Sequence, residues 1–171
     1  LARNFGTMTK SFHIGRAAQV GVTAAGLVAK GFTADNAILD DSGNVIEIYA
    51  GGDGDLVEEV LSSLGNSWTI LSPGNCVKRW PCCYSGHRTV AALIELIERH
   101  NIIGSDVTEV SVSFLPGGDA SLLSTDPKTG LEGKFSIEYI VAALLLDGEL
   151  KMATFTDAMV QRPEVRQLMK R

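Results

Sequence analysis

The chain lacks the features that mark membrane, nucleic-acid-binding and secreted proteins. Its most apolar stretch, residues 137–146, is too short to span a bilayer, and residues 1–5 lack the pattern of a signal peptide, so we expect none there. Lysine and arginine (15) are outnumbered by aspartate and glutamate (20), and aromatic residues make up only 6% of the 171 residues. Because the apolar stretch is so short, we expect no membrane partner. We also expect no nucleic-acid partner, because both a basic surface and a stacking platform are missing.

Cysteine and histidine are also scarce. Cys76, Cys82 and Cys83 are an odd set with an adjacent pair, which makes a poor disulfide framework and favours free thiols in the cytoplasm. The three histidines are scattered and no C-x-x-C spacing occurs, so we expect no metal site. The glycine-rich residues 51–54 lack the strand and helix context of a dinucleotide fingerprint. We expect no cofactor.

Helix periodicity is strong in three places. Residues 89–100 carry apolar side chains at the spacing of one helix face, whereas residues 15–30 and 136–146 are apolar over most of the helix circumference. A shorter helix is predicted over residues 56–64, another over 156–160.

Local signals mark where these helices begin and end. Ser136 suits an N-cap, Gly31 suits the position after a helix end, and Pro163 suits the first turn of a last helix. The almost wholly apolar helices are expected to pack on other helices.

Strand patterns are confined to the middle of the chain. Apolar and polar residues alternate over residues 107–114, which predicts a strand. A further strand is predicted over 67–71, and a strand or extended piece over 76–80. We therefore predict an α+β fold, in which a small α/β domain is inserted between helices. The expected division is a helical segment at 1–34, an α+β domain at 35–123 and returning helices at 124–171.

The segment from Gly6 to Arg16 is the richest in chemical groups. Lys10, His13 and Arg16 place three potential cations on a loop and a helix entry, where the helix dipole also favours an anion. Solvated surface charges and a hydrogen-bonded histidine are the plain alternative. On the residues alone, this segment predicts a local anion site in an otherwise acidic chain.

Four stretches, taken in order, resemble the MmgE/PrpD family. They are the Gly6-to-Arg16 segment, the Val77-to-His87 segment with its Trp-Pro-Cys-Cys core, the Leu131-to-Gly148 segment, and Arg162-Pro163-Glu164-Val165. The family holds 2-methylcitrate dehydratase, cis-aconitate decarboxylase and iminodisuccinate epimerase. Each stretch is a weak pattern alone, but their common order is specific for the family.

The resemblance implies an all-helical domain interrupted by a smaller α+β lid, and a homodimer. Family members are usually much longer, so the chain is expected to be the lid-bearing C-terminal portion. A preceding helical part would then supply further catalytic groups, and this portion alone would be inactive.

The resemblance also implies cofactor-free chemistry on a small di- or tricarboxylate, by elimination or proton abstraction next to a carboxylate. On the matching positions, Lys10 and His13 are expected to be catalytic. Arg16, Tyr49, Lys78 and His87 are expected to bind the substrate, and for His87 a cap of the following helix is the alternative. Lysine and arginine hold carboxylates, and histidine moves protons near neutral pH. The alternative function is a non-catalytic carboxylate-binding or oligomerisation module derived from such an enzyme.

Overall fold

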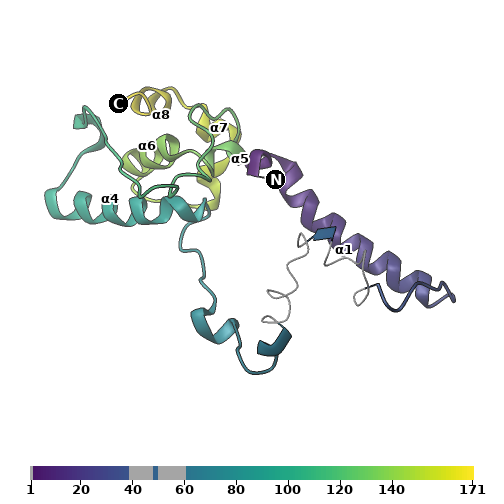
Figure 1. The fold of residues 1–171 in the computed structure, drawn as a ribbon. Helices are drawn as coiled ribbons and strands as arrows, with labels where there is room; N and C mark the ends of the chain where they lie inside the picture. Colours follow the sequence, from purple (N-terminus) through teal and green to yellow (C-terminus); the bar gives the residue numbers. More distant parts are fainter. Residues whose placement is uncertain (1, 39–47, 50–60) are drawn as a thin grey trace. The chain divides into compact units, whose positions relative to one another are not determined.

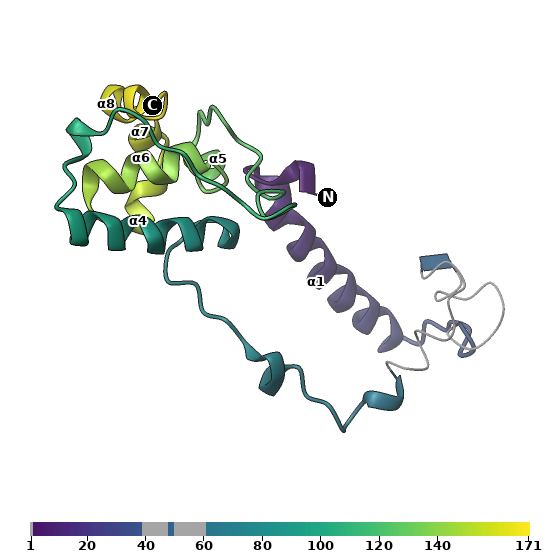
Figure 2. The ribbon, with the colours of Figure 1, turned by 60° about the vertical axis from the view of Figure 1, so that its left-hand side comes forward.

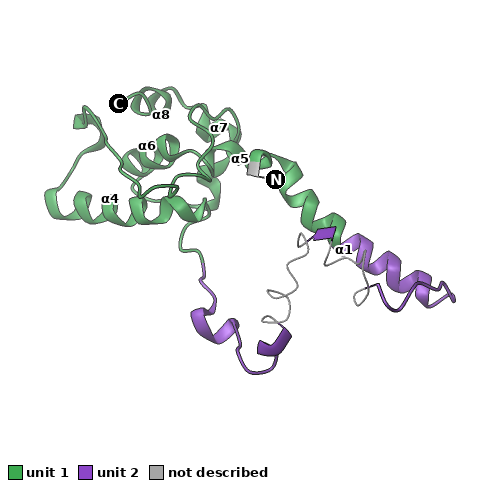
Figure 3. Ribbon diagram, viewed as in Figure 1, with its two compact units in different colours: residues 1–17, 78–171 green, residues 18–77 purple. Residues whose placement is uncertain are grey.

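The computed structural model describes residues 2–38, 48–49 and 61–171. Most of the helix predicted over residues 56–64, and the whole glycine-rich stretch at 51–54, lie outside the described residues. The chain forms two compact units, which Figure 3 distinguishes by colour: residues 1–17 with 78–171, and residues 18–77. Each unit is described here by itself.

The first unit is built around one buried helix, α6 (Ile137–Asp147). Its residues Tyr139 to Leu144 are all buried, as the uniformly apolar sequence of the segment requires. In Figures 1 and 2, α6 lies between α4 (His87–His100) and α8 (Pro163–Leu168), and it contacts both. The prediction of a helix over residues 136–146 is confirmed.

Local capping explains where these helices begin and end. The Ser136 hydroxyl accepts a hydrogen bond from the Tyr139 N–H at 3.2 Å, and Gly148, with φ +72°, closes the other end of α6. Pro163 occupies the first turn of α8, and Asn101 ends α4 in the left-handed conformation. The predictions for Ser136 and Pro163, and of a helix over residues 89–100, are confirmed.

Short elements complete the unit around α6. They are η1 (Ala2–Asn4), η3 (Tyr84–Gly86), η4 (Gly104–Asp106), α5 (Gly130–Gly133), η5 (Met152–Phe155) and α7 (Asp157–Val160). The Tyr139 hydroxyl donates to the Thr154 carbonyl, which ties α6 to η5. Arg162 makes a two-pronged ion pair with Asp147 at 2.9 and 2.7 Å, which joins the start of α8 to the end of α6.

Helix α1 (Met8–Val28) begins earlier than the sequence pattern predicted. Thr7 explains the earlier start, because its hydroxyl accepts from the Thr9 N–H at 3.3 Å and so caps the first turn. The helix ends at Val28, two residues before the predicted end, and Gly31 adopts φ +85° in the turn that follows. None of the described helices is both long enough and apolar enough to cross a membrane.

The predicted α+β fold is wrong for the described residues, which form helices and irregular segments but no strand. Residues 67–71 instead enter a turn, η2 (Ile70–Gly74), where the Trp68 carbonyl accepts from the N–H groups of Leu71 and Ser72. Residues 76–78 are irregular and residues 79–80 form a bend, where the Trp80 carbonyl accepts from the Cys82 N–H at 2.9 Å.

Within residues 107–114, the side chains from 110 to 114 alternate between half-buried and exposed, as in a strand, but the segment does not pair with a second strand in the described part of the chain. Val110, Val112 and Phe114 are half-buried, whereas the residues between them are exposed. The Val110 N–H donates to the Arg171 carbonyl at 3.1 Å, near the chain end rather than in a ladder. A strand exists only where a second segment supplies matching N–H and C=O groups, and alternation alone does not supply them.

Truncation of Ile140 tests whether α6 organises the core. Ile140 is fully buried, so Ile140→Ala should lower the free energy of unfolding by about 2–5 kcal/mol, measured by urea denaturation. Leu146→Ala is the matched control, because Leu146 lies on the same helix with 37% of its surface exposed. Equal losses for the two variants would contradict the assignment of α6 as the core helix.

Candidate functional site

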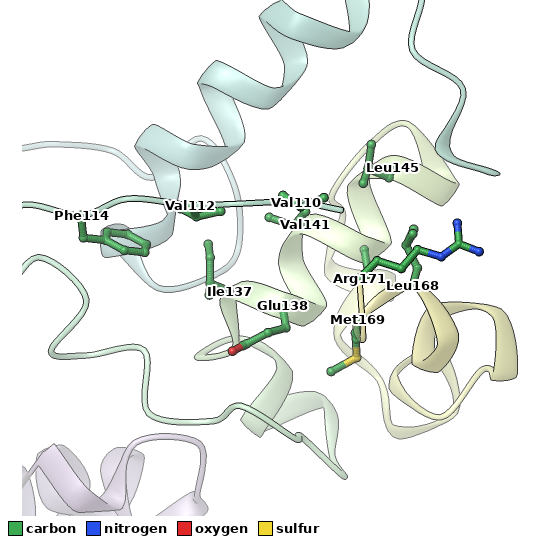
Figure 4. Close-up of a pocket in the computed structure, with 11 residues that line it drawn as sticks. Val110, Val112, Phe114, Ile137, Glu138, Val141, Leu145, Leu168, Met169 and Arg171 are labelled. Carbon is green, nitrogen blue, oxygen red and sulfur yellow. The ribbon is translucent and has the colours of Figure 1, made fainter. Parts of the chain in front are cut away.

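Three pockets stand out among the described residues of the first unit, and two of them are mainly apolar. Figure 4 shows the smaller, of about 220 Å³, where Val110, Val112 and Phe114 of the extended segment face Ile137 and Val141 of α6. The larger, of about 620 Å³, lies between α4 and the same extended segment. Apolar linings of this kind suit packing against apolar groups and offer little to a small anion.

The third hollow, of about 320 Å³, has a different chemistry. Its lining includes three lysines from distant parts of the chain, Lys10, Lys78 and Lys134. The side chains of Thr7, Ser11, Cys82 and Cys83 also line it. We call this hollow the lysine cavity. Within the described part of the chain, the residues that line it include no carboxylate, so its charge is uniformly positive.

Packing of the chain start against the segment before α6 forms one side of the lysine cavity. The rings of Phe5 and Phe135 lie 5.1 Å apart between centroids, and the Lys10 ammonium lies 5.3 Å from the Phe5 centroid. Gly6, at φ +81°, brings its backbone so close that a Cβ there would lie 3.1 Å from the Glu132 Cα. These contacts place Lys10 beside the Lys134 segment.

The segment that carries Lys134 is held by a capping box. The Thr129 hydroxyl accepts from the Glu132 N–H at 3.2 Å, and the Glu132 carboxylate accepts from the Thr129 N–H at 3.0 Å. The Asp157 carboxylate accepts from the Gly130 N–H at 2.8 Å, which joins α5 to α7. Lys134 follows directly after this turn, so the hydrogen bonds of the turn hold its backbone in place.

The adjacent cysteines form the other side of the lysine cavity. The Lys78 ammonium donates to the Cys82 carbonyl at 3.0 Å, and the Cys83 N–H donates to the Lys134 carbonyl at 2.8 Å. The second of these bonds joins two parts of the cavity wall directly. Burial, together with the neighbouring Cys83, raises the pKa of the Cys82 thiol to about 11. Cys82 therefore stays protonated at neutral pH.

The structure brings together two of the six residues predicted for the site. Lys10 and Lys78 both line the lysine cavity. His13 is half-buried and Arg16 is exposed on α1, and neither is among the residues that line the cavity. Their predicted roles stay predictions.

The other two predicted residues are not among those that line the lysine cavity. Tyr49 belongs to the second unit and is largely exposed. His87 begins α4 and is buried, with its ring 5.2 Å from Trp80 and 5.1 Å from Tyr84 between centroids. Its Nε2 atom makes no hydrogen bond within the described structure. Burial lowers the pKa of His87, and backbone groups of Trp80 and Cys82 oppose that shift in part.

Sequence reasoning missed Lys134 and Cys83 as site residues. Lys134 stood in a stretch that resembled the family, but nothing local marked its side chain as functional. The one local feature that distinguished Cys83 in the sequence was the adjacent Cys82. Both become recognisable once the fold places them beside Lys10 and Lys78.

Chemically, the lysine cavity is suited to a small anion with several acidic groups. Three ammonium groups around one hollow raise the local concentration of anions and favour negative charge that develops during a reaction. Within the described part of the chain, no group of histidine, cysteine, aspartate and glutamate side chains is arranged to hold a metal ion.

Comparison with known proteins gives a family and several relatives. A family model described as the MmgE/PrpD C-terminal domain matches residues 80–171. The matched range includes the cavity residues Cys82, Cys83, Leu131, Lys134 and Phe135.

Three relatives are named cis-aconitate decarboxylase. The protein from Homo sapiens is 28% identical, with 97% of this chain and 34% of that protein covered. The protein from Mus musculus is 29% identical over 98% of this chain and 35% of its own length. The protein from Aspergillus terreus (strain NIH 2624 / FGSC A1156) is 27% identical over 96% of this chain and 36% of its own length. The chain thus spans about a third of the length of the curated relatives it matches.

The lowered pKa of His87 predicts a pH dependence of stability. Because the folded state favours neutral His87, the unfolded state binds more protons as the pH falls below 6.5, and stability is lost in that range. His87→Gln should therefore flatten the fall in urea midpoint between about pH 7.5 and about pH 5.

His100→Gln is the matched control, since His100 is an exposed histidine at the other end of α4. This variant should keep the pH dependence of the unchanged protein. An H87Q variant whose urea midpoint falls as steeply as that of the unchanged protein would overturn the interpretation.

Proposed function

The chain belongs to the MmgE/PrpD family, and from that premise we propose that it forms part of a lyase for a small di- or tricarboxylate, with the lysine cavity as a substrate-binding wall. The observation that carries the proposal is the meeting of Lys10, Lys78 and Lys134 around one hollow of about 320 Å³. That volume suits a small acid, and three cations suit several carboxylates.

The lysines act mainly by charge and position. In the proposed reaction, a proton or a carboxyl group is lost next to a carboxylate-bearing carbon, and an electron pair is left on the substrate. Ammonium groups fixed before the reaction stabilise that charge more than mobile water does, because they need no reorganisation. They also hold the substrate in one orientation, which removes part of the entropic cost of the step.

Proton transfer requires a group that takes up and releases a proton, in addition to fixed positive charge. Lys10 and His13 remain our candidates for catalytic roles, and His13 lies on the same helix as Lys10. Because the chain spans about a third of its relatives' length, we propose that groups outside the 171 residues complete the active site.

The choice of substrate follows the relatives' names. We propose cis-aconitate as the first acid to test, because the three relatives described above are named cis-aconitate decarboxylase. 2-Methylcitrate and iminodisuccinate are the other candidates. Dehydration, decarboxylation and epimerisation differ in their leaving groups, and the lysine cavity suits the anionic substrates of all three.

A non-catalytic carboxylate-binding module is the second candidate function. It is supported by the lining of the lysine cavity, which in the described part of the chain includes neither a carboxylate nor a histidine to act as a base. A homodimer also stays a prediction, supported by exposed apolar side chains on α1 such as Ile14 and Val22.

Removal of one cavity lysine tests the proposed function in the full-length protein. Lys78→Gln and Lys134→Gln should each lower kcat/KM roughly 100-fold on whichever of the three acids is turned over, because each removes one preorganised charge. Lys170→Gln is the control, since Lys170 is exposed and does not line the cavity.

Turnover that is unchanged in both cavity variants would contradict the role of the lysine cavity. Isothermal titration with the same acids separates the two candidate functions. Binding that weakens in the cavity variants, without turnover in the unchanged full-length protein, would favour the binding module.

A further inference from the structure

The lysine cavity contains two thiols that the proposed reaction does not use. Cys82 and Cys83 are both buried and both line the cavity, and neither forms a disulfide. The third free cysteine, Cys76, is exposed and lies outside the cavity lining. A thiol becomes a nucleophile as the thiolate, and nearby cations favour that form.

The two cavity thiols differ in their surroundings. Burial holds the pKa of Cys82 at about 11, so Cys82 is a poor nucleophile at neutral pH. Cys83 retains 8% of its surface and is anchored to the Lys134 segment by its own N–H, at 2.8 Å from the Lys134 carbonyl. Of the two, Cys83 is therefore placed to react with a molecule held by the lysines.

We propose that Cys83 is a covalent modification site for electrophiles that carry a carboxylate. Lys10, Lys78 and Lys134 attract the carboxylate into the cavity, and the electrophilic carbon of the same small molecule then lies within the hollow that Cys83 lines. The inference rests on the carboxylate-binding role proposed for the lysine cavity, but it does not require turnover.

Iodoacetate is a suitable probe of this chemistry. The Cys83 sulfur, after losing its proton to solvent, attacks the methylene carbon and forms a C–S bond. The C–I bond breaks, and iodide leaves with the electron pair. Iodoacetamide reacts by the same step without the negative charge, so the pair of reagents isolates the contribution of the anion.

The experiment compares the two reagents on the full-length protein under native conditions. Peptide mass spectrometry gives the alkylation rate at each cysteine, and the ratio of the iodoacetate rate to the iodoacetamide rate is calculated for Cys83 and for Cys76. Because a focused field raises local anion concentration, this ratio should be at least about tenfold higher at Cys83. Equal ratios at the two cysteines, or preferential alkylation at Cys82, would overturn the proposal.

Two further measurements extend the test, and the first of them does not depend on how variants fold. Tricarballylate, a saturated tricarboxylate, should slow iodoacetate alkylation of Cys83 in the unchanged protein and leave Cys76 unaffected. Lys134→Gln should lower the Cys83 ratio, whereas Lys170→Gln should not. The absence of tricarballylate protection would also count against the site.

These outcomes can be separated from those of the proposed function. A full-length protein that turns over its acid but shows no charge preference at Cys83 contradicts only this inference. A protein with the preference but without turnover supports the anion-directed thiol and contradicts the lyase.

Discussion

The rest of the first unit depends on the burial of α6. A helix that is apolar on all sides must be covered on all sides, so α4, α8 and η4 contact it, and Phe155 of η5 and Val160 of α7 join its core cluster. The polar groups that this burial brings inside are paired, as with the Tyr139 hydroxyl and the Thr154 carbonyl. Burial also raises the pKa of Tyr139 to about 12, which keeps its hydroxyl protonated as a donor.

The candidate site takes its shape from the turn that leads into α6. Close backbone packing holds this turn, since a Cβ at Gly133 would lie 2.9 Å from the Tyr139 ring and 3.0 Å from Val160. Lys134 and Phe135 follow at once, and they meet Phe5, Lys10 and the Cys83 backbone. The position of the cations is thus a consequence of core packing a few residues away, and a small shift of the turn would move one wall of the lysine cavity.

Local signals predicted helices well and strands badly, for one physical reason. The caps at Ser136 and Pro163 and the face pattern of residues 89–100 act within a few residues, so they are readable along the chain. A strand needs a partner segment, and alternation over residues 107–114 contains no information about that partner. The same limit applies to the site. Lys10 and Lys78 carried signals of their own, whereas Lys134 and Cys83 became candidates through their neighbours in space.

By itself, the sequence determined the family resemblance, the principal helices and the presence of cations near the chain start. These properties depend on residue order over short distances. Only the tertiary structure decided that three lysines from distant segments share one hollow, that Cys82 and Cys83 lie beside them, and that His87 is instead buried between Trp80 and Tyr84. Electrostatic and covalent chemistry depends on distances between side chains, and those distances are set by how α6 is covered.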